Sequence, residues 1–212
     1  MQDKRRCAEL ERILIEPRVI PVLSIARLED ALPLARALAE GGLTTLEITL
    51  RTSAALAAIR TISKALPNVS VGVGTVRTPE QAVEAIKAGA EFIVSPGMTP
   101  HLSEAAPSWS VPLLPGVATA SEAMVLSDLG YSVLKFFPAE PAGGVAALKS
   151  LAAPLPDIRF CPTGGIDAGN AATYLALPNV VAVGGSWVAP AAMVERQDWS
   201  AISVLARDAH AA

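Results

Sequence analysis

The chain alternates strand-like and helix-like segments along almost its whole length, and this order constrains the fold more than any other feature. Short runs rich in Val, Ile and Leu are separated by Ala- and Leu-rich segments with helical spacing. The eight strand-like runs lie at 18–25, 44–50, 70–75, 91–95, 111–114, 131–137, 157–162 and 180–184. Strands that alternate with helices pair in parallel, because parallel neighbours need crossover connections. The order therefore predicts an α/β fold with a parallel sheet.

A closed (β/α)8 TIM barrel accounts for all of these strands, and an open, doubly wound sheet is the alternative. A further helix is expected over residues 3–15, before the first strand. Thr78 before Pro79 predicts a helix start, and Gly89 predicts the end of the same helix. No linker or low-complexity stretch divides the chain. We therefore expect a single (β/α)8 barrel domain with an extra N-terminal helix over residues 1–212.

Composition narrows the class of function. Hydrophobic residues make up 51% of the chain, yet no uninterrupted apolar run of about 18 residues suggests a membrane span. The first residues lack the apolar core of a signal peptide. The net charge is −3 without basic clusters, so nothing indicates nucleic-acid binding. Two cysteines, Cys7 and Cys161, are too few for a disulfide framework. We expect a cytoplasmic protein that acts on small molecules.

Lys135 is the only charged residue in the apolar run from Tyr131 to Pro138. Removal from water disfavours the charged ammonium and leaves a neutral amine that can act as a nucleophile. Lysines in such settings form Schiff bases with carbonyl substrates. The sequence therefore predicts that Lys135 is a nucleophile at the end of a strand.

The second strand brings two more charges to the same region. Strand alternation turns Glu47 and Arg51 to the inward face, whereas Leu46, Ile48 and Leu50 face the helices. In a barrel, active sites lie at the C-terminal ends of the strands, where these side chains are expected. A structural ion pair between Glu47 and Arg51 is the alternative. The presence of Lys135 favours the catalytic interpretation.

Glycines and small polar residues follow several other strands. The third strand ends in Gly72-Val73-Gly74-Thr75, which permits close approach of a ligand or, alternatively, of neighbouring side chains. The seventh is followed by Gly164 and Gly165, and the eighth runs into Gly184, Gly185 and Ser186. Turns after the last two strands of a barrel often bind phosphate through backbone N–H groups. This pair of turns predicts a phosphate site.

The two histidines offer no comparable chemistry. His101 follows Pro100 at an expected helix start and His210 lies near the C-terminus, so both are expected to be solvated. Cys161 is expected to be a small core residue. With no Cys/His cluster in the sequence, we expect no metal site and no cofactor.

These residues resemble the class I 2-keto-3-deoxy-6-phosphogluconate (KDPG) aldolases, which often also act on 4-hydroxy-2-oxoglutarate (KHG). The resemblance covers nearly the whole chain. It is carried by Leu46–Thr52, Val73–Val76, Ser95–Gly97, Leu134–Glu140, Arg159–Ile166 and Gly184–Trp187. The segment around Lys135 and the segment ending in Gly165-Ile166 are specific in combination.

The resemblance implies a TIM barrel, a homotrimer, and a lyase of the Entner–Doudoroff pathway that needs no cofactor. It implies cleavage of KDPG to pyruvate and D-glyceraldehyde 3-phosphate, and of KHG to pyruvate and glyoxylate. Lys135 would be the Schiff-base lysine and Glu47 the general acid and base. Arg51 and Thr75, with Lys135, would hold pyruvate. The remaining implied residues shape the pocket (Pro96, Phe137, Thr163) or bind the phosphate (Gly164, Gly165, Gly184, Gly185, Ser186).

One residue departs from the family pattern. Val73 stands where a smaller Ala is expected, and we expect it to narrow the pocket floor without removing a functional group. Two other interpretations stay open. Another phosphate-binding barrel enzyme, such as an epimerase or synthase, would explain the glycine turns but leave Lys135 unused. A non-catalytic sugar-phosphate-binding barrel would have no use for a buried lysine.

Overall fold

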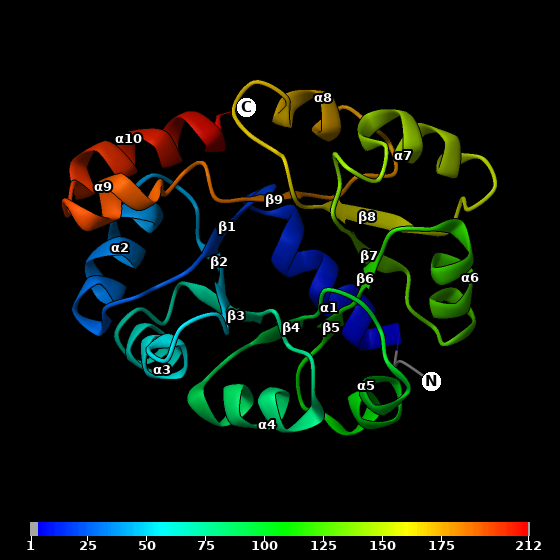
Figure 1. Ribbon diagram of the computed structural model, residues 1–212, viewed down its shortest axis with the longest axis horizontal. Helices are drawn as coiled ribbons and strands as arrows, with labels where there is room; N and C mark the ends of the chain where they lie inside the picture. Colours follow the sequence, from blue (N-terminus) through cyan, green and yellow to red (C-terminus); the bar gives the residue numbers. More distant parts are fainter. Residues whose placement is uncertain (1–3, 212) are drawn as a thin grey trace.

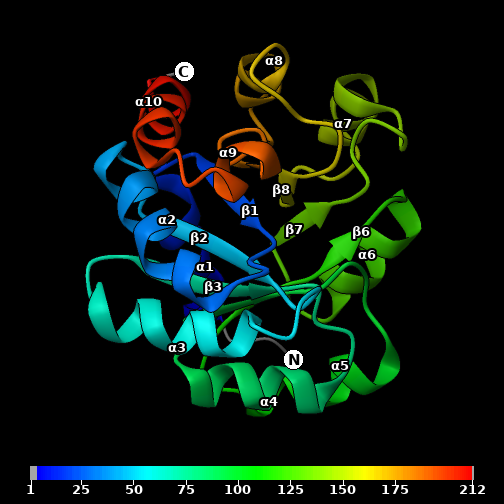
Figure 2. The ribbon, with the colours of Figure 1, turned by 60° about the vertical axis from the view of Figure 1, so that its left-hand side comes forward.

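The computed structural model describes residues 4–211 and places their strands in two parallel sheets (Figure 1). The strands are β1 (Val19–Leu23), β2 (Thr45–Thr49), β3 (Ser70–Gly74), β4 (Phe92–Val94), β5 (Leu113–Leu114), β6 (Gly116–Val117), β7 (Val133–Phe136), β8 (Arg159–Pro162) and β9 (Val183–Gly185). The larger sheet has six strands in the order β5-β4-β3-β2-β1-β9, and the smaller has three in the order β6-β7-β8. Figure 2 shows β6 and β7 on one side of the molecule and β2 and β3 on the other.

The helices lie around these sheets in Figure 1, except that the N-terminal helix crosses the middle of the view. They are α1 (Lys4–Ile15), α2 (Leu28–Glu40), α3 (Ala55–Ala65), α4 (Pro79–Ala88), α5 (Pro100–Ala105), α6 (Ala120–Asp128), α7 (Gly144–Ala152), α8 (Ala171–Leu175), α9 (Ala191–Glu195) and α10 (Trp199–His210), with a 3₁₀ turn at Ala106–Ser108. The N-terminal helix expected over 3–15 is α1, although residue 3 lies outside the described residues.

The closed eight-stranded barrel expected from the sequence is wrong. The fifth strand is interrupted at Pro115, so that β5 pairs with β4 whereas β6 pairs with β7. Proline has no N–H to give to a neighbouring strand, which is the physical reason for a break at this point. On the other side, β8 meets the β9 segment only at two isolated bridges, Phe160 to Val180 and Thr163 to Gly184. The result is a curled six-stranded sheet and a separate three-stranded sheet.

Alternation along the strands sorts the core into two clusters. Leu46 and Ile48 of β2 pack in the large cluster that includes the helices. Phe92 and Val94 of β4 face the other way and join a smaller cluster between the sheets, which also contains residues of β1, β5, β7 and β8. Leu10 and Leu14 of α1 belong to this smaller cluster, so α1 covers one end of the interior. Glu47 of β2 and Lys135 of β7 are charged residues buried between the two sheets.

Local signals set the helix ends as the sequence predicts. The Thr78 side chain caps α4 by accepting a hydrogen bond from the Gln81 backbone N–H, and Pro79 occupies the first turn. Gly89 ends α4 with a φ of 106°, a conformation that favours glycine. Among the described residues, no helix combines the length and apolarity needed to cross a bilayer.

Candidate active site

Glu47 and Lys135 form a buried ion pair between the two sheets. Lys135 Nζ on β7 lies 3.1 Å from Oε1 and 3.3 Å from Oε2 of Glu47 on β2. Desolvating two charges costs several kcal/mol per ion, and a buried pair of this kind is weak evidence for stability. Its retention in the interior therefore favours a chemical role. Arg51 is not the partner of Glu47; it lies exposed on the wall of a cavity.

Gly74 makes room for the Glu47 carboxylate. A Cβ atom at Gly74 would lie 2.7 Å from Cγ and 2.8 Å from Cδ of Glu47, and closer still to Oε1. The neighbouring Gly72 is covered in the same way by the ring of Phe92. The glycines of the third strand thus accommodate protein side chains, which is the second of the two interpretations their pattern allowed. Gly74 nevertheless serves the site, because it fixes where Glu47 can stand.

Phe137 connects the ion pair to a cavity of about 700 Å³. Lys135 Nζ lies 5.5 Å from the centre of the Phe137 ring, and the same side chain lines the cavity. A volume of this size is typical of sites for small molecules. The predicted residues that line the cavity are Arg51, Phe137, Thr163, Gly164, Gly165, Gly185 and Ser186. The structure therefore gathers residues from four different strand ends around one space.

Thr75, Pro96 and Gly184 are not among the residues that line the cavity. Thr75 is half-buried at the end of β3 with a φ of 62°, and Pro96 is exposed after β4. Gly184 is buried beneath Thr163, whose Oγ1 would clash with any Cβ at that position. Val73 packs in the large core cluster with the helices, so the expectation that it narrows the pocket floor is wrong. Its position in β3 turns it away from Glu47.

The Gly164-Gly165 turn is held by the segment that follows β7. Both glycines have positive φ values, 103° and 79°. The backbone N–H of Glu140 donates to the Gly164 carbonyl at 3.0 Å, and the Glu140 side chain covers Gly165 and accepts a hydrogen bond from the Tyr174 hydroxyl. Burial and the Glu140 carboxylate raise the pKa of Tyr174. Glu140 thus orders the turn, a role that sequence spacing did not reveal.

Cys161 lies opposite Lys135 in the pairing of β7 with β8. Burial raises the pKa of its thiol to about 12. The thiol is therefore protonated at neutral pH and does not compete with Lys135 as a nucleophile. His101 and His210 are both exposed, as predicted. Within residues 4–211, no three His, Cys, Asp or Glu side chains form a group that could hold a metal ion.

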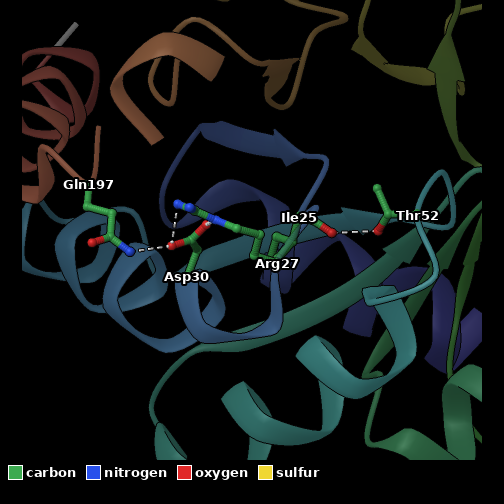
Figure 3. Close-up of polar contacts among 5 residues, drawn as sticks. All are labelled: Ile25, Arg27, Asp30, Thr52 and Gln197. Carbon is green, nitrogen blue, oxygen red and sulfur yellow. Dashed lines mark hydrogen bonds and ion pairs between the residues drawn. The ribbon is translucent and has the colours of Figure 1, made fainter. Parts of the chain in front are cut away.

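The cavity also has lining residues that the sequence did not single out. Arg27 and Asp30 come from the segment around the start of α2, and Glu195 comes from the end of α9. Asp30 accepts hydrogen bonds from Arg27 and from Gln197, as Figure 3 shows. The only signal in the sequence is a basic and an acidic residue three positions apart at a helix start, which usually indicates a solvated ion pair.

Comparison with known proteins settles the family. The chain matches the KDPG and KHG aldolase family over residues 10–205. It is 51% identical over 206 residues to the 2-dehydro-3-deoxy-phosphogluconate aldolase of Pseudomonas aeruginosa, covering 97% of this chain and 94% of that protein. It is 49% identical over 199 residues to the KHG/KDPG aldolase of Escherichia coli K12, covering 94% and 93%.

The chain belongs to the KDPG and KHG aldolase family. Two solved family structures agree with the fold described above. The KDPG aldolase of Legionella pneumophila, with pyruvate captured as a covalent carbinolamine intermediate, has a TM-score of 0.91 at 45% identity over 93% of this chain and 96% of that chain. That of Zymomonas mobilis ZM4, with 3-phosphoglycerate, has a TM-score of 0.92 at 46% identity over 97% and 96%. The two-sheet arrangement is therefore a KDPG-aldolase-like fold.

Proposed function

We propose that this chain is a class I aldolase that cleaves KDPG to pyruvate and D-glyceraldehyde 3-phosphate. The observation that carries the proposal is the buried contact between Lys135 Nζ and the Glu47 carboxylate at 3.1 Å, next to a cavity bounded by two glycine turns. An amine and a carboxylate within hydrogen-bond reach are the nucleophile and the proton-transfer group that imine chemistry needs. The family's named activities and the carbinolamine in the Legionella relative support it further.

The proposed reaction begins when the neutral amine of Lys135 attacks the C2 ketone. Loss of water gives a protonated imine, which withdraws electrons from the C3–C4 bond. Glu47, through a water molecule, accepts the C4 hydroxyl proton, the C3–C4 bond breaks, and the aldehyde leaves. Glu47 then returns a proton to C3 of the enamine, and hydrolysis frees pyruvate and Lys135. One carboxylate beside the lysine serves both proton transfers.

The residues of the predicted site fit the two charged ends of this substrate. We assign the pyruvate carboxylate to Arg51 and Thr75, since an arginine binds a carboxylate through its planar fork. We assign the phosphate to the turns formed by Gly164-Gly165 and by Gly184, Gly185 and Ser186. Backbone N–H groups of such turns bind anions. Pro96, Phe137 and Thr163 would shape the space between, and the ring of Phe137 would lie beside the imine.

A second substrate is proposed for the same site. KHG carries the same 2-keto group and C4 hydroxyl, so the same imine step would release pyruvate and glyoxylate. The relative from Escherichia coli is named for both activities. We further propose that residues 1–212 form one domain, that the chain works in the cytoplasm, and that it assembles as a homotrimer. Analytical ultracentrifugation would test the trimer, and a monomer at assay concentrations would contradict it.

The function is tested by measuring pyruvate release in a coupled lactate dehydrogenase assay. We expect turnover of KDPG and of KHG, and loss of most activity in Glu47→Gln. A protein that binds KDPG in calorimetry but releases no pyruvate would be the non-catalytic barrel. Conversion of a sugar phosphate without carbon–carbon cleavage would identify another phosphate-binding enzyme. Full cleavage by Glu47→Gln would remove Glu47 from its role.

A further inference from the structure

Arg27 is a cation on the cavity wall that the proposed mechanism does not use. It lies in the connection between β1 and α2 and is the residue immediately before α2. Its side chain is 46% exposed, so the guanidinium is open to the cavity. An arginine in such a place is well suited to meet an anionic group of a ligand.

The strand order places Arg27 between the two ends of the proposed site. Strand β1 pairs with β9 on one side, where Pro21 lies opposite Gly185, and with β2 on the other, where Val22 lies opposite Glu47. The segment after β1 therefore runs between Ser186, which follows β9, and Arg51, which follows β2. Arg27 is five positions beyond Val22, the residue level with Glu47. It thus belongs to the outer part of the cavity, away from the reacting carbon.

Contacts with Asp30 fix the orientation of Arg27. Its Nε and Nη2 donate to Asp30 at 2.7 Å and 3.1 Å, and Asp30 also accepts a hydrogen bond from Gln197 at 2.9 Å (Figure 3). Asp30 is only 3% exposed. Burial raises the pKa of its carboxyl, but the hydrogen bonds from Arg27 and Gln197 outweigh burial and bring the pKa below its usual value. Asp30 therefore stays ionised at neutral pH and holds the guanidinium in one place.

This arrangement leaves one edge of the guanidinium available. The bonds to Asp30 use Nε and Nη2, and none of the hydrogen bonds found within residues 4–211 uses Nη1. The main-chain loop is held as well, because the Thr52 hydroxyl donates to the Ile25 carbonyl (Figure 3). A fixed arginine with free donors is preorganised for phosphate, so little side-chain entropy is lost on binding.

The cavity wall also carries a negative charge. Glu195 at the end of α9 lines the same cavity. The pKa of Arg27 is raised mainly by its hydrogen bond to Asp30 and the Asp30 charge, and Glu195 adds the smallest contribution in the same direction. Arg27 and Glu195 do not meet in an ion pair in the described structure. An anionic substrate end entering beside Glu195 needs a positive group to offset that charge, and Arg27 is the cation of the β1–α2 segment.

We propose that Arg27 is a specificity-determining residue that contacts the phosphate of the substrate, together with the Gly164-Gly165 turn and Ser186. Asp30 and Gln197 are its positioning residues. The proposal rests on the proposed function, since it names a further determinant of the same site. It assigns the phosphate rather than the carboxylate because the carboxylate is attached to C2 and must stay beside Lys135, whereas Arg27 lies in the outer cavity.

The test compares KDPG with the same keto acid lacking its phosphate, in the wild type and in Arg27→Gln. The preference for the phosphorylated substrate is measured as the ratio of the two kcat/KM values. Because Arg27→Gln removes one charge-assisted hydrogen bond, we expect this ratio to fall about tenfold or more in that variant. Arg36→Gln is the matched control, because Arg36 is exposed on α2, the helix that follows Arg27, and does not line the cavity. Arg27→Lys keeps the charge without the fork and is expected to give an intermediate ratio.

Asp30→Asn should lower the same ratio by a smaller factor, mainly through KM, whereas a merely structural contact would change both substrates equally. An unchanged ratio in Arg27→Gln, or equal losses on both substrates, overturns the proposal. Absence of pyruvate release by the wild type would instead overturn the proposed function. In that case, calorimetry with inorganic phosphate still decides the matter, since weaker binding by Arg27→Gln than by Arg36→Gln supports the contact and equal binding refutes it.

Discussion

Gly74→Ala should disable the proposed active site without changing any charged group. The added methyl would stand 2.7 Å from Cγ of Glu47, whereas ordinary contacts begin at 3.4 Å. The carboxylate must therefore move by about 1 Å, and a displacement of that size at a reacting centre costs on the order of 100-fold in rate. This corresponds to about 2.7 kcal/mol in the activation barrier. Gly74 does not have a positive φ, so alanine strains the side chains rather than the backbone.

The assay is kcat for KDPG, with thermal unfolding measured in parallel. Gly97→Ala is the control, because a Cβ at Gly97 has no neighbour within 4 Å and the residue also follows a strand on the larger sheet. We expect Gly97→Ala to keep nearly full activity and Gly74→Ala to lose about 100-fold while remaining folded. Wild-type kcat in a folded Gly74→Ala protein would refute the argument that the position of Glu47 sets the rate.

Three further predictions concern stability and substrate binding. Lys135→Met leaves the buried Glu47 charge unpaired and should lower the free energy of unfolding by about 3–5 kcal/mol in urea titrations, with recovery in the Lys135→Met/Glu47→Leu double variant; no recovery would speak against an uncompensated charge. The depressed pKa of Asp30 stabilises the fold above the ordinary value of 3.8, and this contribution is lost as the pH falls through the lower folded value. Asp30→Asn should therefore be less stable than the wild type at pH 7 by a margin that shrinks in acid, and a constant margin would contradict the assignment. In Gly165→Ala, the new Cβ would lie 2.6 Å from Glu140 Cγ, and the backbone φ of 79° is strained for alanine. This variant should therefore raise KM for KDPG about tenfold or more, whereas Gly97→Ala should not.

Side-chain alternation makes much of the site predictable from the sequence. A period of two fixes which residues of a strand share a face, so the inward position of Glu47 and the outward position of Leu46 both follow from the order of residues alone. The apolar surroundings of Lys135 mark it as well, since an isolated charge in a buried strand needs a partner. The ion pair between Lys135 and Glu47 confirms the expected placement of both side chains.

Other features depend on contacts that periodicity does not encode. Alternation predicts the strands, but it does not show whether each strand is hydrogen-bonded to the next. The prediction of a closed barrel was therefore made without the break at Pro115, which separates the two sheets. Val73 was assigned to the pocket from its place in a motif, although its parity places it with the helices. The contact between Gln197 and Asp30 joins residues 167 positions apart, so no local sequence pattern predicts it.

The central claim is that Lys135 forms the imine with pyruvate. The most direct measurement is borohydride reduction of the protein in the presence of pyruvate, followed by mass analysis of its peptides. We expect one reduced pyruvate adduct per chain, located on Lys135, and none when borohydride or pyruvate is left out. An adduct on a different lysine, or no adduct while KDPG is being cleaved, would contradict the claim.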